Sequence, residues 1–355
     1  MTDTTPASPV ADTKRREHPV ADPDRSRLVL DAFPDDPSLL ARLRGQHVLS
    51  MRDYDAPLLR QLMRLAARCE RKELPADQPM RCRILSSLFM DEPACSGRLS
   101  FKSAWLRLGG SVLDAENYAR QILSQRYTPE EVAELCNNYS DIAVLRTEDS
   151  ESFHDMLPRF RVPVINAGDG AVEHPSHAMA DLYTLCKWRP ELFSEQPPEQ
   201  GRLTVALLGD PSRTRTLRSF LRLLCLFPQA VERVILYSRV AQGIAPEQRD
   251  ELGQAGIRVD TLAELYPLAT DMEIARELIP TLDLIYVHYV QPAQVRRLQI
   301  VESMALHKPD AMILSPQVPT AEAAHLLNDS PLNGYFAQAR GAVYVRMALF
   351  SAILG

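Results

Sequence analysis

One stretch near the middle of the chain, residues 168–185, constrains the fold more than any other. It follows the apolar run 162–166, which is typical of a buried strand. Gly168 and Gly170 break that strand, and Pro175 suits the first turn of a helix because its missing N–H would have no partner there. We therefore predict a strand, a tight turn and a helix that could join two halves of similar size.

His174 lies where this helix begins, just beyond the end of the strand. Ligands of open α/β sheets bind at that edge, so His174 is a candidate site residue. The alternative is a helix-start residue bonded only to backbone. His174 and His177 are also spaced like a pair of metal ligands, but a zinc site needs a third protein ligand and none is evident. We predict neither a metal nor a cofactor.

Short apolar runs alternate with helix patterns along most of the chain. Strands are predicted at residues 83–90, 108–113, 141–146, 203–208, 233–237 and 282–287. Thr128 and Glu131 form the signature of a capping box at a helix start, and Asp53 or Asp55 can cap an earlier helix. A chain of 355 residues is long enough for two α/β domains with their own cores.

Composition excludes several classes of protein. The net charge of −6 argues against a general nucleic-acid binder. No apolar run approaches the roughly 20 residues that span a bilayer, and the N-terminus lacks the apolar region of a secretory signal. The six cysteines show neither a CxxC motif nor zinc spacing, which is typical of reduced thiols in a cytosolic protein. We therefore predict a cytoplasmic protein that binds neither membrane nor nucleic acid.

The segment 174–181 resembles the His-Pro-x-Gln-x-x-x-Asp segment of the aspartate/ornithine carbamoyltransferase superfamily, most closely that of the aspartate carbamoyltransferases. His174 and Asp181 match, and His177 stands where the family usually has Gln. In that family the His binds the carbonyl oxygen of carbamoyl phosphate, so the resemblance implies a catalytic role for His174. Several motifs in the same order extend the resemblance over residues 40–355.

The resemblance implies a domain organisation. Two doubly wound parallel-sheet α/β domains would be joined by helices, in a homotrimer with sites at subunit interfaces. Residues 39–185, completed by the helix 338–355, would bind the carbamoyl donor, and residues 186–337 would bind the amino acid. Residues 1–38 are rich in Pro, Asp, Thr and Arg, and we predict a disordered or loosely docked tail.

The donor motif departs from the family pattern. The family carries Ser-Thr-Arg-Thr-Arg after its first strand and grips the phosphate with it, whereas residues 94–98 here read Ala-Cys-Ser-Gly-Arg. Ser96, Gly97 and Arg98 are the implied donor contacts, and losing the other Arg removes a charge-assisted contact of about 1.5–3 kcal/mol. Cys95 as a nucleophile is an alternative, but no base for it is evident. The family's mobile-loop Lys has no clean match, and Arg126 is the nearest cation.

The remaining motifs match the family pattern only in part. Arg146, at the end of a predicted strand, matches the family Arg that contacts the carbamoyl carbonyl. Arg215 and Thr216 match the motif whose Arg binds the α-carboxylate of the acceptor. Gln291 matches the Gln of an Arg-x-Gln stretch, but Tyr289 replaces the Arg that holds the aspartate side chain.

From this mixture we predict an enzyme, a divergent transferase that moves a carbamoyl or related acyl group from an anionic donor to an amino-acid-like acceptor other than aspartate. Arg146, His174 and Arg98 would act on the carbonyl group. The alternative is a non-catalytic structural or regulatory subunit, associated with another carbamoyltransferase or pathway enzyme. An ordinary aspartate carbamoyltransferase of pyrimidine biosynthesis is the third interpretation, and a small-ligand sensor the fourth.

Overall fold

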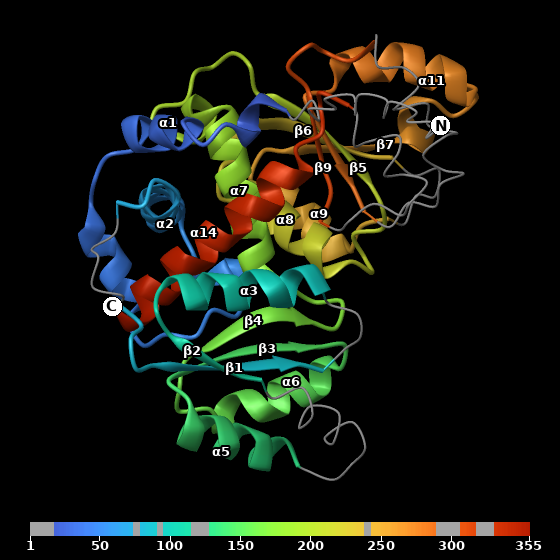
Figure 1. Cartoon of the computed structure of the whole chain (residues 1–355). Coiled ribbons are helices and arrows are strands. Elements are labelled where there is room, and N and C mark those ends of the chain that lie inside the picture. Colours follow the sequence, from blue (N-terminus) through green and yellow to red (C-terminus); the bar gives the residue numbers. More distant parts are fainter. Residues whose placement is uncertain are drawn as a thin grey trace, which may run out of the picture.

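The computed structural model describes residues 18–73, 79–90, 95–114, 128–237, 243–288, 306–316 and 330–355. These residues form two parallel β-sheets, each flanked by helices (Figure 1). The predicted fold class, two doubly wound parallel sheets joined by helices, is therefore confirmed.

Both sheets have a point at which the strand order reverses. The first sheet has the order β2 (Ser111–Asp114), β1 (Ile84–Phe89), β3 (Ile142–Thr147) and β4 (Val164–Asp169). The second has the order β7 (Arg258–Thr261), β6 (Val231–Leu236), β5 (Leu203–Leu208), β8 (Leu284–Val287) and β9 (Met312–Leu314). The order reverses between β1 and β3 and between β5 and β8. Loops that leave neighbouring strands there run to opposite faces, which opens a crevice for a ligand.

The described residues form eleven α-helices, of which only some begin at a side-chain cap. They are α1 (Arg25–Ala32), α2 (Ala56–Glu70), α3 (Cys95–Arg107), α5 (Pro129–Tyr139), α6 (Ser150–Met156), α7 (Pro175–Trp188), α8 (Arg215–Cys225), α9 (Pro246–Gln254), α10 (Leu262–Leu265), α11 (Asp271–Leu278) and α14 (Tyr335–Leu354). Asp55 caps α2 by accepting the Leu58 N–H at 2.9 Å, and the predicted capping box of Thr128 and Glu131 starts α5. In the described ranges, no helix is long and apolar enough to cross a membrane.

Two helices connect the halves of the molecule. Helix α7 follows β4, and all of its residues except His177 are buried, because it has neighbours on every side. Helix α14, drawn in red in Figure 1, packs against α2, α3 and α7. The C-terminal helix therefore returns to the first half, as the resemblance implied.

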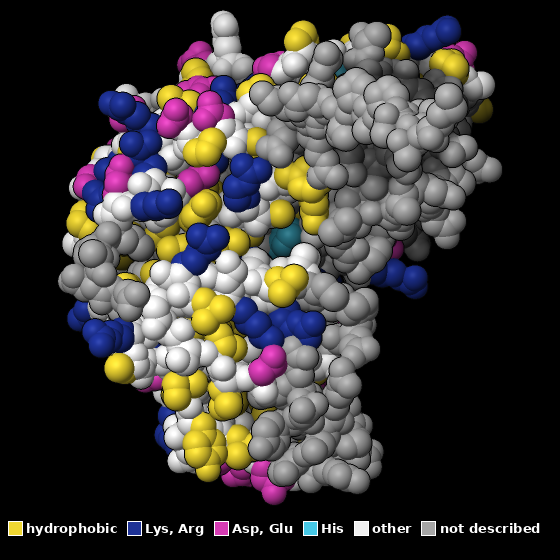
Figure 2. All heavy atoms as spheres, in the orientation of Figure 1, with side chains coloured by type: hydrophobic (Ala, Val, Ile, Leu, Met, Phe, Trp, Pro, Cys, Tyr) yellow, Lys and Arg dark blue, Asp and Glu magenta, His cyan; other side chains and the backbone are white. Residues whose placement is uncertain are grey.

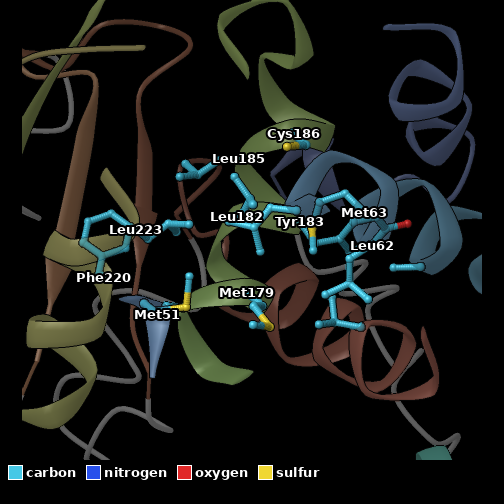
Figure 3. Close-up of a cluster of buried hydrophobic side chains, with 14 of the residues drawn as sticks. Met51, Leu62, Met63, Met179, Leu182, Tyr183, Leu185, Cys186, Phe220 and Leu223 are labelled. Atoms are coloured by element: carbon cyan, nitrogen blue, oxygen red, sulfur yellow. The ribbon is translucent and has the colours of Figure 1, made fainter. Parts of the chain in front are cut away.

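The main core extends through both halves and has α7 at its centre. Figure 3 shows Met179 and Leu182 of α7 between Leu62 of α2 on one side and Phe220 and Leu223 of α8 on the other. All five side chains are fully buried. Burial on two sides explains why the apolar residues of α7 are not confined to one helical stripe.

The predicted tail is shorter than expected. Residues 18–38 contain α1, and Val20, Val29 and Phe33 are buried in the main core. The prediction of a disordered or loosely docked tail up to residue 38 was therefore wrong. The few apolar side chains that pack there are spread through a polar sequence, so they form no pattern that indicates burial. Residues 1–17 lie outside the described residues. The domain boundary at residues 185 and 186 stays a prediction.

Candidate active site

A pocket of about 800 Å³ lies where the switch points of the two sheets face each other. Its walls come from the residues that follow β1, β3 and β4 in the first half and β5, β8 and β9 in the second, and from α14. The carboxyl ends of parallel strands place side chains from distant parts of the sequence at one edge. The pocket is therefore built by both halves of the chain.

The pocket is electropositive. Four arginines line it, Arg146, Arg213, Arg215 and Arg346, whereas Glu148 is the one carboxylate among the described lining residues. Glu148 is 72% exposed, so water screens its charge. Such a site favours a ligand that carries more than one negative charge.

His174 is held by backbone contacts and keeps its ring in the pocket. Its N–H donates to Ser219 Oγ of α8 at 2.9 Å. His174 is the N-cap residue of α7, but its side chain makes no capping hydrogen bond, and its ring Nδ1 lies 3.4 Å from Ser176 Oγ. The pKa of His174 lies well below its usual value, chiefly because burial disfavours the imidazolium, and also because His177 and three arginines are near. The ring is therefore neutral and can donate a hydrogen bond to a carbonyl oxygen.

Arg215 reaches from the second half of the chain to the first. Its Nη1 donates to the Gly170 carbonyl oxygen at 2.5 Å, and its Nη2 lies 3.7 Å from Glu148 Oε1. Gly168 has φ +124°, and a Cβ there would lie 2.7 Å from Arg215 Nε. The glycine is therefore required both for its backbone conformation and for the passage of the guanidinium.

His177, which is partly buried, and Asp181, which is fully buried, lie one helical turn apart. His177 Nε2 lies 3.7 Å from Asp181 Oδ1, and burial lowers the pKa of His177 to about 3. Burial raises the pKa of Asp181 to about 8, although its oxygens accept hydrogen bonds from Tyr286 Oη at 2.9 Å and from Gln338 Nε2. Both groups are therefore neutral at neutral pH. No set of three or more metal-ligating side chains occurs in the part of the chain that the structure describes.

Most of the predicted site residues meet in this pocket. Its lining includes Ser96, Gly97, Arg146, His174, His177, Arg215 and Thr216. Arg98 does not line it, so its predicted catalytic position is wrong. Ser96, Gly97 and Ser100 occupy the pocket side of α3, and at about 100° per residue Arg98 falls on another side. Gln291 and Arg126 lie outside the described residues.

Sequence reasoning missed several residues of the pocket, among them Arg346 and His288. Arg346 of α14 is 2% exposed, and its Nη1 donates to Ser100 Oγ of α3. His288 follows β8, and burial lowers its pKa to about 3. A signal for Arg346 does exist, because it is the one charge in the apolar run from Ala342 to Leu354, and a buried charge needs a partner.

Comparisons with known proteins agree with this geometry. The family model "Aspartate/ornithine carbamoyltransferase, carbamoyl-P binding domain" matches residues 46–187. The aspartate carbamoyltransferase catalytic subunit of Methanopyrus kandleri is 30% identical over 331 residues, which are 89% of this chain and 99% of that protein. The catalytic subunit of Dichelobacter nodosus is 28% identical and is covered to 90%.

A solved structure shows the same fold. Aspartate transcarbamoylase from Trypanosoma cruzi, in complex with aspartate and phosphate, superposes with a TM-score of 0.74 at 24% identity. The match covers 89% of this chain and 97% of that one. At this identity the likeness supports the fold alone.

These relatives correct the predicted function. Transfer to an acceptor other than aspartate was inferred from local departures such as Ser96 and Tyr289, but the relatives that match nearly the whole chain are named aspartate carbamoyltransferases. The comparisons favour the third interpretation over the divergent transferase. The chain belongs to the aspartate/ornithine carbamoyltransferase superfamily and is closest there to the aspartate carbamoyltransferase catalytic chain.

Proposed function

We propose that this chain is an aspartate carbamoyltransferase, which transfers the carbamoyl group of carbamoyl phosphate to the amine of L-aspartate and releases phosphate. The observation that carries the proposal is the meeting of Arg146, His174 and Arg215 in one electropositive pocket. Both substrates are anions, and the pocket has the complementary charge. The names of the relatives support the same reaction.

The carbonyl group would be activated by Arg146 and His174. As the amine attacks the carbonyl carbon, negative charge develops on the carbonyl oxygen, and the bond from carbon to the phosphate oxygen then breaks. A guanidinium and a neutral imidazole N–H that already point into the pocket stabilise that charge without reorganisation. The neutral state of His174 suits this role, because a neutral ring nitrogen donates while the ring adds no charge that would repel the nearby arginines.

The acceptor would be held by the second half of the chain. Arg215 supplies a guanidinium for the α-carboxylate, and Thr216 Oγ1 is buried without a hydrogen-bond partner among the described residues. An amino acid fixed by its carboxylate presents its amine at a defined distance from the donor. We assign Gln291 to the acceptor by resemblance, and its placement lies outside the described residues.

We also propose a homotrimer. Leu99 and Leu106 of α3 are 63% and 59% exposed, and their spacing of seven residues puts them on one side of the helix. Hydrophobic side chains are visible at the surface over α3 in Figure 2. Exposed apolar side chains that gather on one helix mark a surface for association, and the resemblance implies contacts between catalytic chains beside the site.

The test is an assay of the purified full-length chain with carbamoyl phosphate and a panel of amino acids. We expect N-carbamoyl-L-aspartate and an equal amount of phosphate, identified by mass spectrometry and a phosphate assay. Product with another amino acid but not with aspartate would contradict the proposal. Absence of any product from a folded chain would contradict it as well.

A further inference from the structure

Arg346 is a buried cation that pairs with no carboxylate among the residues that the structure describes. Its side chain comes from the middle of α14 and is 2% exposed. Its guanidinium carbon lies 4.2 Å from the centre of the Phe101 ring, and its Nη1 donates to Ser100 Oγ. Burial alone lowers its pKa to about 9, with no opposing contribution from a carboxylate.

Two other buried cations in the described part of the chain are paired with buried carboxylates. Lys187 Nζ lies 2.9 Å from Glu70 Oε1, and Arg222 Nη1 lies 2.5 Å from Glu173 Oε1. Removing a charge from water is costly unless a counter-charge replaces the water. Arg346 has no such carboxylate in the described part of the chain, so an anionic ligand would supply the missing counter-charge.

The Arg346 side chain lines the pocket, and one edge of its guanidinium has no acceptor among the described residues. Arg346 lines the pocket together with Ser96, Gly97 and Ser100, which come from the first two turns of α3. Within the described ranges, Nη1 makes the one hydrogen bond, and Nε is buried without an acceptor. The edge formed by Nε and Nη2 therefore remains for an oxyanion, and two parallel N–H donors match two oxygens of a phosphate.

Ser100 fixes this cation to α3. Its hydroxyl accepts from Arg346 and lies 2.8 Å from the Ser96 carbonyl oxygen and 2.7 Å from that of Gly97, to which it donates. Arg346 of α14 is thereby tied to the start of α3, the helix that follows β1. A phosphate bound between Arg346 and this helix start would also share the pocket with Arg146, because both arginines line it.

We propose that Arg346 binds the phosphate group of the donor, taking over the contact that an arginine at position 96 would make in the family. Carbamoyl phosphate as the donor rests on the proposed function, whereas binding of a phosphate dianion beside Arg346 does not. In this chain the phosphate would be held by a cation from the C-terminal helix. The small side chain of Ser96 would leave room for that cation.

The test uses inorganic phosphate as the probe and isothermal titration calorimetry on the full-length chain. We expect Arg346→Gln to weaken phosphate binding about 10-fold or more, the effect of losing a charge-assisted contact. Arg346→Lys should recover part of the affinity, because it keeps the charge but loses the two-pronged geometry. The control is Arg340→Gln, an exposed position of the same helix outside the pocket, which should bind phosphate like the unmodified chain.

The outcomes separate this inference from the proposed function. Phosphate binding that depends on Arg346, in a chain that makes no carbamoyl aspartate, would support the inference and overturn the proposed function. Turnover with an unchanged KM for carbamoyl phosphate in Arg346→Gln would overturn the inference alone. Failure of the unmodified chain to bind millimolar phosphate would also overturn it. If Arg346→Gln does not fold, equal phosphate affinity in Arg346→Lys and the unmodified chain would overturn the two-pronged contact.

Discussion

The neutral state of His174 has a direct consequence for catalysis. We expect His174→Ala to lower kcat by about 100-fold, because one preorganised donor to the developing oxyanion is lost. Burial holds the pKa of His174 well below its usual value, so its ring is neutral throughout the range from pH 6 to 8. The ratio of kcat between the unmodified chain and His174→Ala should therefore not change with pH over this range in steady-state measurements. A fall in that ratio as the pH drops towards 6 would contradict a neutral donor.

Asp181 makes stability depend on pH in an unusual direction. Its folded pKa of about 8 lies above its ordinary value of 3.8, so the folded chain holds a proton that the unfolded chain has lost. This contribution to stability is complete below about pH 4 and is lost as the pH rises towards 8, at no more than about 1.4 kcal/mol per pH unit.

Substitution of Asp181 tests this linkage. Asp181→Asn removes the titrating group, and Gln338 can turn its unpartnered Oε1 towards the new amide. The variant should therefore gain stability over the unmodified chain between pH 5 and 8, measured by urea unfolding at several pH values. A stability difference that does not change with pH would show that Asp181 is ionised in the folded chain.

At the scale of elements, one buried carboxylate ties the two halves together beside the site. Glu173, between β4 and α7, pairs with Arg222 of α8 and accepts from Ser219 Oγ at 3.0 Å and the Met51 N–H at 3.1 Å. Ser219 in turn accepts the N–H of His174. The network therefore fixes α8 against the start of α7 and positions the catalytic histidine.

Breaking this network should be costly. Glu173→Gln leaves the Arg222 charge buried without its counter-charge, and we expect a loss of about 3–5 kcal/mol in the free energy of unfolding. The matched control is Glu134→Gln, which breaks an ion pair with Arg161 whose side chains are 44% and 63% exposed. Because water screens both charges, its loss should be far smaller than that of Glu173→Gln. Equal losses in denaturant titrations would show that burial does not set the strength of the Glu173 pair.

The sequence predicts these elements to different degrees. Most strands, though not β7 and β9, were predicted because buried parallel strands are continuous apolar runs. The caps of α2 and α5 were predicted because caps need particular side chains, such as Thr128. Helix α1 was missed because its few buried residues depend on the tertiary neighbours α2 and α7. Arg98 was misplaced because a motif match gives order along the chain but not the side of the helix. Arg346 was missed because its partner Ser100 is 246 residues away.

For the whole molecule, the exposed leucines of α3 test the proposed assembly. We expect the unmodified chain to sediment at about three times the 39.9 kDa of one chain. Leu106→Glu should shift it towards the monomer, because a charge on an apolar contact must be desolvated there. Activity should fall with it, since the implied sites lie at subunit interfaces. Leu268→Glu, a change at a 97% exposed leucine in the second half, is the control and should leave the mass unchanged.

A Leu106→Glu chain that keeps the mass of the unmodified protein would place the contact elsewhere than on α3. Loss of activity in a variant of unchanged mass would point instead to the pocket side of the same helix, where Ser96 and Ser100 lie.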